Sequence, residues 1–272
     1  MPQQPRRIPD RPFLPGFCSG FALALALSSL SPALAASPDC PKRQATLLVD
    51  NLWRISAASQ SSKSLRILAI GSSSTQGIGA SAPGFTYPAQ LQIILATLLG
   101  RPVEVENAGI GGETIAATVV RLKAALADKP DLVIWQVGTN DAVIGEDEAS
   151  FRSSLLDGVT AIRATKTPFV LLDPQVYPGL KDTAHYEQYV RIIDDTGQTS
   201  GAAVFARYAM MKEWETQSDS LLRAMLSGDQ FHMSDRGYGC LAQNLAADLA
   251  PRLHQVSTQA IDNSALAVSI VK

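Results

Sequence analysis

The stretch LRILAIGSSSTQGIG, residues 65–79, joins an apolar run to a cluster of hydroxyl side chains. The run from Ile67 to Ile70 has no polar alternation, which is typical of a strand buried on both faces of a sheet. It stops at Gly71, and the segment 72–75 that follows is Ser-Ser-Ser-Thr. Such a strand end is either a polar turn or a place where a serine acts as a nucleophile. The pattern of the remaining chain distinguishes these two interpretations.

Apolar runs of this kind alternate along the chain with longer segments of helical spacing. The segments predicted to be strands are 65–71, 103–109, 131–138, 168–175 and 202–208. The segments predicted to be helices are 87–100, which ends at Gly100, 113–128, 148–165, 182–198, and 234–253, which ends near Pro251.

Buried strands separated by helices indicate right-handed crossovers and a parallel sheet that is covered on both sides. We therefore expect a three-layer α/β/α sandwich with a mostly parallel sheet of about five strands. A TIM barrel would require about eight strand–helix units, which the sequence does not contain. In an open parallel sheet, ligands bind beyond the carboxyl ends of the strands, so functional residues are expected there.

The first 35 residues have the layout of a secretory signal peptide. Arginines at positions 6, 7 and 11 precede an apolar segment over 17–30, and Ala33 and Ala35 match an A-x-A cleavage site. The alternative, an uncleaved membrane anchor, would require an apolar segment of about 20 residues. We expect export to the periplasm or the medium, with no membrane span left after cleavage. The predicted divisions are a signal peptide (1–35), an extension (36–64), the main domain (65–255) and a tail (256–272).

Charge and cysteine content limit the classes of partner. The formal net charge of −2 becomes −4 when the signal peptide is removed, and no basic patch is visible, so nucleic acid is not an expected partner. Cys18 leaves with the signal peptide, whereas Cys40 and Cys240 remain. In an oxidising compartment this pair forms either a disulfide or two free thiols. No His/Cys pair has a ligand spacing, so no metal is expected.

The strand ends carry the parts of a serine hydrolase. Ser73 follows the first predicted strand, the second ends in the glycine-rich segment 107–112, and Asn140 follows the third. Asp229 and His232 lie three residues apart before the last helix. A serine needs a base, the base needs a carboxylate that orients it, and the tetrahedral intermediate needs donors for its oxyanion. The G-x-S-x-G elbow, the P-loop and the G-x-G-x-x-G motif are all missing.

These four motifs, in this order, resemble the SGNH (GDSL-type) hydrolase family of esterases and lipases over residues 65–250. The resemblance implies a flavodoxin-like sandwich that needs no cofactor. It implies that Ser73 is the nucleophile and, through its N–H, one oxyanion donor. Gly112 and Asn140 would be the other two donors, with His232 as the base and Asp229 orienting it.

The first motif departs from the family at one position, where Ser72 replaces the usual aspartate. Because serines flank the proposed nucleophile, Ser72 and Ser74 remain alternative nucleophiles. His185 is the alternative base, and the segment 173–187, which follows the fourth strand, is a candidate wall of the substrate pocket.

The predicted function is an exported serine esterase that forms an acyl-enzyme on Ser73. The substrate is a small-molecule or carbohydrate ester, which leaves a carbohydrate O-acetylesterase and a small-ester or lipid esterase as options. Two alternatives remain open: an acyltransferase that acts on envelope sugars, and a non-catalytic carbohydrate-binding module with the same fold.

Overall fold

The computed structural model describes residues 40, 41 and 64–269, with side chains as far as Leu253. The predicted signal peptide, its uncleaved-anchor alternative and most of the predicted extension lie outside the described residues. The part described in detail is one compact α/β unit.

The centre of this unit is a sheet of five parallel strands in the order β2-β1-β3-β4-β5. The strands are β1 (Leu65–Gly71), β2 (Val103–Gly109), β3 (Leu132–Gln136), β4 (Phe169–Leu172) and β5 (Ala203–Phe205). This is the flavodoxin-like order of a doubly wound sheet. The predicted parallel, five-stranded sheet is therefore confirmed.

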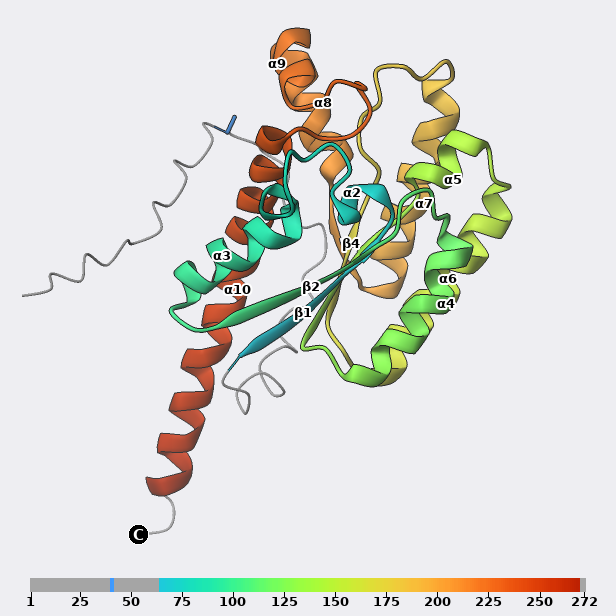
Figure 1. Cartoon of the computed structure of the whole chain (residues 1–272). Helices are drawn as coiled ribbons and strands as arrows, with labels where there is room; N and C mark the ends of the chain where they lie inside the picture. Colours follow the sequence, from blue (N-terminus) through green and yellow to red (C-terminus); the bar gives the residue numbers. More distant parts are fainter. Residues whose placement is uncertain (1–39, 42–63, 270–272) are drawn as a thin grey trace, which may run out of the picture. The chain divides into compact units, whose positions relative to one another are not determined.

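Helices cover both faces of the sheet, as the expected three-layer sandwich requires (Figure 1). One face carries α3 and α10, which pack against each other. The other face carries α4, α6 and α7, which pack side by side in that order. Their bounds are α3 (Tyr87–Leu99), α4 (Ile115–Ala125), α6 (Glu148–Thr165), α7 (Thr183–Ser200) and α10 (Asp235–Ser269).

Capping residues explain several of the helix boundaries. The Thr86 side chain accepts a hydrogen bond from the Ala89 N–H at the start of α3, and Pro88 occupies the first turn, where a missing N–H costs nothing. Helix α3 ends at Gly100, which adopts the left-handed conformation (φ 62°), so the predicted end is confirmed. Asp147 caps α6 in the same way that Thr86 caps α3.

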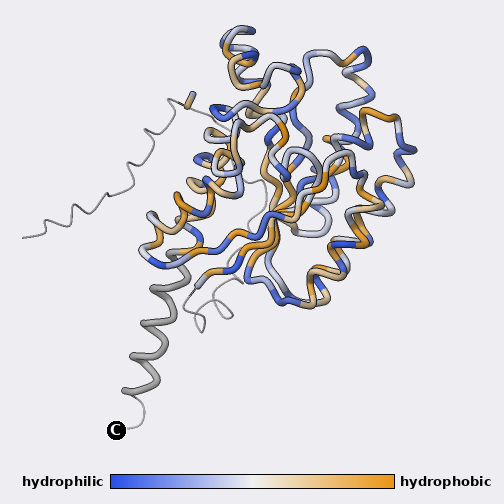
Figure 2. The backbone as a smooth tube through the Cα atoms, in the orientation of Figure 1, coloured by the Kyte–Doolittle hydropathy of each residue, from blue (hydrophilic) through white to orange (hydrophobic). Residues whose placement is uncertain are grey.

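The hydrophobic core lies on both sides of the central strands (Figure 2). Every residue of β3 and β4 is buried, which includes the indole of Trp135. The edge strand β2 is an exception to the expectation that the strands are buried on both faces, because Glu104 and Glu106 are exposed. Since β2 has a neighbour on one side only, its charged side chains reach solvent at little cost.

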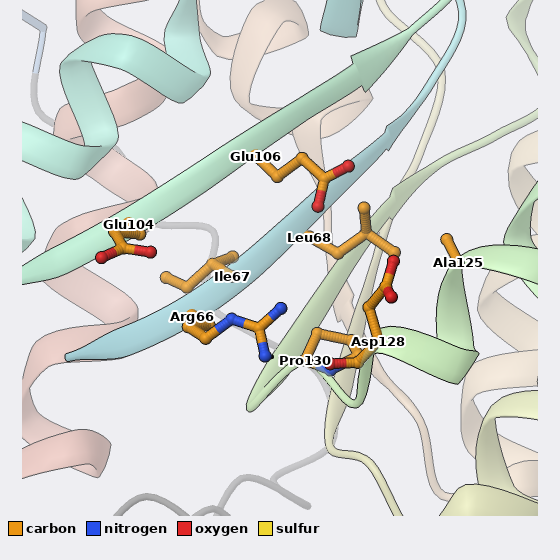
Figure 3. Close-up of a pocket in the computed structure, with 8 residues that line it drawn as sticks. All are labelled: Arg66, Ile67, Leu68, Glu104, Glu106, Ala125, Asp128 and Pro130. Atoms are coloured by element: carbon orange, nitrogen blue, oxygen red, sulfur yellow. Dashed lines mark hydrogen bonds between the residues drawn. The ribbon is translucent and has the colours of Figure 1, made fainter. Parts of the chain in front are cut away.

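A cleft of about 110 Å³ lies beside the exposed part of β2 (Figure 3). It is lined by the first half of β1, by Glu104 and Glu106, and by the segment that joins α4 to β3. These residues lie at the amino-terminal halves of the strands, whereas ligands of a parallel sheet bind at the carboxyl ends. We assign no catalytic role to this cleft.

Some predicted boundaries differ from the structure. Strand β4 ends at Leu172 because Pro174 has no N–H for a ladder, and β5 ends at Phe205 because α8 begins at Arg207. The predicted end of the last helix near Pro251 is wrong, since α10 continues through this proline to Ser269. A proline removes one helical hydrogen bond, and the alanines and leucines around it favour helix.

Four helices were not predicted, and three of them have six residues or fewer, which is too short to show a reliable period. Three of them follow strands directly, and the fourth lies before the loop that leads into α10. They are α2 (Ser73–Gln76), α5 (Thr139–Ile144), α8 (Arg207–Gln217) and α9 (Asp219–Ala224).

A disulfide joins Cys40 to Cys240, with Cα atoms 5.4 Å apart. Cys240 is buried in α10, so the bond attaches Cys40 to the core. The two residues are 200 positions apart in the sequence, so the bond closes almost the whole described unit.

The strand order creates a switch point at the carboxyl ends of β1 and β3. From β1 the chain crosses to β2 on one side, and from β3 it continues to β4 and β5 on the other. A crevice forms where these connections diverge. Ser73 lies just after β1 and Asn140 just after β3, so the fold places both at this point.

Candidate active site

Ser73 is the first residue of α2, directly beyond the carboxyl end of β1. Gly71 at the end of β1 permits a close approach to β3, since a Cβ there would lie 2.6 Å from Gln136 Oε1. Only 6% of Ser73 is exposed. Its N–H lies in the first turn of a helix, where backbone donors have no partner within the helix.

The two neighbouring serines have other partners. The hydroxyl of Ser72 donates to Gln136 Oε1 (3.0 Å), as does its backbone N–H (2.8 Å). The hydroxyl of Ser74 donates to Gln175 Oε1 (2.7 Å). Both serines are buried and hydrogen-bonded to glutamines, whereas Ser73 is the one whose Oγ lies next to an imidazole. This geometry favours Ser73 over the two alternatives.

The loop before α10 brings His232 and Asp229 to Ser73. His232 Nε2 lies 2.9 Å from Ser73 Oγ, and its Nδ1 lies 2.6 Å from Asp229 Oδ2. The other carboxylate oxygen of Asp229 accepts the backbone N–H groups of Phe231 and His232 (both 2.9 Å). The loop is therefore folded around the carboxylate, which holds the imidazole ring in place.

The electrostatics of the loop define the tautomer of His232. Burial acts to raise the pKa of Asp229, but hydrogen bonds from His232, from the Phe231 N–H and from the Ser227 hydroxyl outweigh it and lower this pKa. An ionised carboxylate can only accept, so Nδ1 of His232 carries the proton and donates to Asp229. Nε2 is then the acceptor for the Ser73 hydroxyl.

The two predicted oxyanion donors, Gly112 and Asn140, lie beyond the ends of β2 and β3. Gly112 has a positive φ (79°), and its N–H has no acceptor among the described residues. Asn140 Nδ2 donates to the Glu113 carbonyl (2.7 Å), which uses one of its two hydrogens. The side-chain amide of Asn140 therefore has a second hydrogen for which no acceptor is found among the described residues. The loop at Gly111 approaches Ser73 closely, because a side-chain carbon at Gly111 would lie 3.9 Å from Ser73 Cβ.

Two further residues hold this glycine loop. Buried Asp141 accepts the Ile115 N–H (2.9 Å), and burial raises the pKa of its carboxyl. Arg121 of α4 binds Glu113 (Nε to Oε1, 3.0 Å) and donates to the Ala108 carbonyl (2.8 Å). Sequence reasoning missed Arg121, because its eight-residue spacing from Glu113 does not suggest a pair.

The alternative base, His185, has different partners. Its Nδ1 lies 3.8 Å from Glu148 Oε1, and its ring makes an edge contact with Tyr189 (5.3 Å between centroids). His185 lies in the first turn of α7, and the structure does not bring it to Ser73, where His232 occupies the position of a base.

The segment 173–187 does reach the site, as predicted for a candidate wall of the pocket. Tyr177 makes an edge contact with Phe231 (4.7 Å), and Phe231 makes a second one with the His232 ring (4.7 Å). All three rings are partly exposed. They form an aromatic surface that continues from the imidazole.

Two other observations concern cofactors and membranes. Among the residues that the structure describes, no three His, Cys, Asp or Glu side chains gather in a way that could hold a metal ion. Within the same residues, no helix combines the length and apolarity that a membrane span requires.

The arrangement has the parts of a nucleophilic acyl-transfer site: a hydroxyl bound to an imidazole, a carboxylate behind the imidazole, and backbone and amide donors beside the hydroxyl.

Comparisons with known proteins are consistent with this chemistry. The model of the non-GDSL lipase-like family matches residues 39–255. The chain is 26% identical over 208 residues to esterase TesA of Pseudomonas aeruginosa, which covers 76% of this chain and 98% of that protein. It is 32% identical over 121 residues to an acetylxylan esterase of Xylanibacter ruminicola, covering 41% of this chain and 24% of that protein.

A solved structure gives the same result for the fold. AlinE4, an SGNH-hydrolase family esterase, superposes with a TM-score of 0.53 at 27% identity, covering 71% of this chain and 98% of that one. The predicted resemblance to SGNH esterases is therefore confirmed.

Proposed function

The chain belongs to the non-GDSL lipase-like family and is a carboxylic ester hydrolase, and we propose that it is an exported serine esterase that acts through an acyl-enzyme on Ser73. The observation that carries the proposal is the continuous chain of contacts from Ser73 Oγ to His232 Nε2 (2.9 Å) and from His232 Nδ1 to Asp229 (2.6 Å).

In the first half of the reaction, Ser73 Oγ attacks the ester carbonyl while His232 Nε2 takes the hydroxyl proton. Asp229 stays ionised and stabilises the imidazolium. The tetrahedral intermediate then collapses, the bond to the alcohol breaks, and His232 gives its proton to the alkoxide that leaves. In the second half, water attacks the acyl-enzyme by the same steps, which release the acid and restore the serine.

The negative charge on the carbonyl oxygen would be held by three donors: the N–H groups of Ser73 and Gly112, and the second amide hydrogen of Asn140. Donors that are already in place cost no reorganisation when the charge develops. The bonds that hold the glycine loop to Asn140 and Asp141 support this role, since they keep the donors near the nucleophile.

For the substrate we propose an acetyl ester on a saccharide. Two observations support this choice: the partial match to a protein named acetylxylan esterase, and the aromatic surface of Tyr177 and Phe231 beside His232. Aromatic faces pack well against the C–H faces of sugar rings. Export, which the first 35 residues predict, would give the enzyme access to acetylated polysaccharides outside the cytoplasm.

The test compares three esters with the purified protein: acetylated xylo-oligosaccharides, p-nitrophenyl acetate and p-nitrophenyl decanoate. The expected result is that the wild type has its highest kcat/KM on the acetylated oligosaccharide. Ser73→Ala should show no turnover above background on any of the three esters. A higher kcat/KM on the decanoate would indicate that the substrate is a lipid-like ester and not an acetylated saccharide. Transfer of acetyl to added sugar faster than its release to water would make the protein an acyltransferase. Turnover of none of the three esters, with retained sugar binding, would support a non-catalytic module.

A further inference from the structure

Behind the catalytic residues lies an arginine that is fully buried. Arg207, the first residue of α8, has 0% exposure. Its guanidinium donates to the Asp173 carbonyl (2.9 Å), to Thr139 Oγ1 (3.3 Å) and, at a longer distance, to Gln175 Oε1 (3.5 Å). A buried charge is costly unless it is well hydrogen-bonded, so its presence here requires an explanation.

Gln175, which is 1% exposed, continues these contacts toward the surface. Its Oε1 accepts the Ser74 hydroxyl (2.7 Å), and its Nε2 donates to the Phe231 carbonyl (2.6 Å). The backbone carbonyl of Gln175 accepts the Tyr186 hydroxyl (2.8 Å), which fixes the position from which the side chain extends.

Three of the partners of this pair share one property: each is the chain neighbour of a residue in the proposed mechanism. Ser74 follows Ser73, Thr139 precedes Asn140, and Phe231 precedes His232. We propose that Arg207 and Gln175 form a buried positioning pair that holds the nucleophile, the base and the oxyanion amide in register. This inference rests on the proposed function, because it takes the roles of those three residues as given.

The need for such a pair follows from the topology. Ser73 and His232 are 159 residues apart and lie on different segments. Other bonds join these segments farther from the reacting atoms, such as the one from the Tyr238 hydroxyl to the Ile78 carbonyl (2.7 Å). The side-chain amide of Gln175, by contrast, binds Ser74 and Phe231, each of which is one residue from a reacting group. A displacement of about 1 Å at a reacting group can cost roughly 100-fold in rate.

The two functional groups of Gln175 are both required for this role. Its carbonyl oxygen holds α2, and its amide nitrogen holds the loop of the base. Methionine has a similar length and flexibility but offers neither strong bond, so Gln175→Met disconnects the two segments with little change in volume.

The experiment measures kcat, KM and the rate of labelling by a fluorophosphonate probe for Gln175→Met, Ser74→Ala and Thr139→Val. The matched control is Thr196→Val, which loses another buried hydroxyl that donates to the Ile192 carbonyl (2.7 Å) within α7. All assays are made well below the unfolding temperature of each variant.

We expect Gln175→Met to lower kcat and the labelling rate by about 10-fold to 100-fold, with KM within about twofold of wild type. Ser74→Ala and Thr139→Val should lower both rates by about threefold to 10-fold, because each loses one bond of the set. Thr196→Val should lose about as much thermal stability as Ser74→Ala and Thr139→Val, because it also loses one buried hydrogen bond. It should keep the kcat of the wild type.

Two outcomes would overturn the inference. One is a folded Gln175→Met variant with kcat and labelling within twofold of wild type. The other applies if Gln175→Met does not fold: kcat and labelling within twofold of wild type in both Ser74→Ala and Thr139→Val would then overturn the inference. Failure of the proposed function is distinguishable, since either the wild type would then show no turnover and no labelling, or Ser73→Ala would keep its turnover.

Discussion

A methyl group at Gly109 should displace the nucleophile. Gly109 ends β2 opposite Gly71, and a Cβ placed there would lie 2.0 Å from the backbone nitrogen of Gln76 and 2.5 Å from the carbonyl carbon of Thr75. Ordinary contact begins at 3.4 Å, so these groups must separate by about 1.4 Å. Both clashing atoms belong to the backbone of α2, the helix that begins with Ser73. No side-chain rotation can relieve the contact.

This separation predicts the size of the effect. Because a misplacement of about 1 Å can cost roughly 100-fold, kcat/KM of Gly109→Ala should fall by about two orders of magnitude, or about 2.7 kcal/mol of transition-state stabilisation. Overpacking of this kind also costs about 1–3 kcal/mol of stability. Steady-state kinetics and thermal unfolding, measured on the same preparation, separate the two losses.

The control is Gly84→Ala, where a new side-chain carbon would meet no atom within 4 Å. It should keep both its activity and its unfolding temperature. Wild-type kinetics for a folded Gly109→Ala variant would refute the reasoning, because they would mean that α2 can move by this amount without loss of catalysis.

Three further predictions concern stability and the oxyanion loop. Cys40→Ala opens a loop of 200 residues and should lower the free energy of unfolding by roughly 2–5 kcal/mol in urea denaturation; an unchanged midpoint would contradict this. Burial raises the pKa of Asp173 to about 8, above the unfolded value of about 3.9, so the folded state binds more protons and loses stability between about pH 4 and pH 8. The free energy of unfolding of Asp173→Asn, relative to that of wild type, should therefore increase from pH 5 to pH 8. If this difference does not change with pH, Asp173 is not a buried neutral acid in the folded state. Arg121→Met releases Glu113 and should lower kcat about 10-fold with little change in KM, whereas an unaltered kcat would mean that Asn140 and Asp141 hold the loop alone.

Periodicity and strand-end chemistry were sufficient to predict most of the architecture. The central strands have strong signals, because apolar runs such as LVIW in β3 are bounded by charged residues and glycine. The parallel sheet then follows from the helices between them. The shared location of Ser73 and Asn140 follows as well, since both end strands that meet at the switch point.

The residues that support the candidate active site could not be predicted from sequence patterns. Gln136, Gln175 and Arg207 are polar residues within or beside predicted strands, where a single sequence gives no reason to expect long-range bonds. A polar residue in an otherwise apolar run is the one available signal, as Gln136 is in β3. The partners of such residues are defined only when the fold brings distant segments together.

Helix ends were missed for a related reason. The prediction that the last helix stops near Pro251 used a local rule, whereas α10 has strong helix formers on both sides of that proline. Short helices such as α2 give no periodic signal, yet α2 is the element that positions Ser73.

The most direct test of the central claim is fluorophosphonate labelling of the purified protein, followed by peptide mapping, with Ser73→Ala as the control. The account predicts one adduct, on Ser73, that is absent from the control and reduced at least about 10-fold in rate by His232→Ala, because the imidazole activates the hydroxyl. An adduct on Ser72 or Ser74, or no adduct on a demonstrably folded protein, would contradict the assignment of Ser73 as the nucleophile.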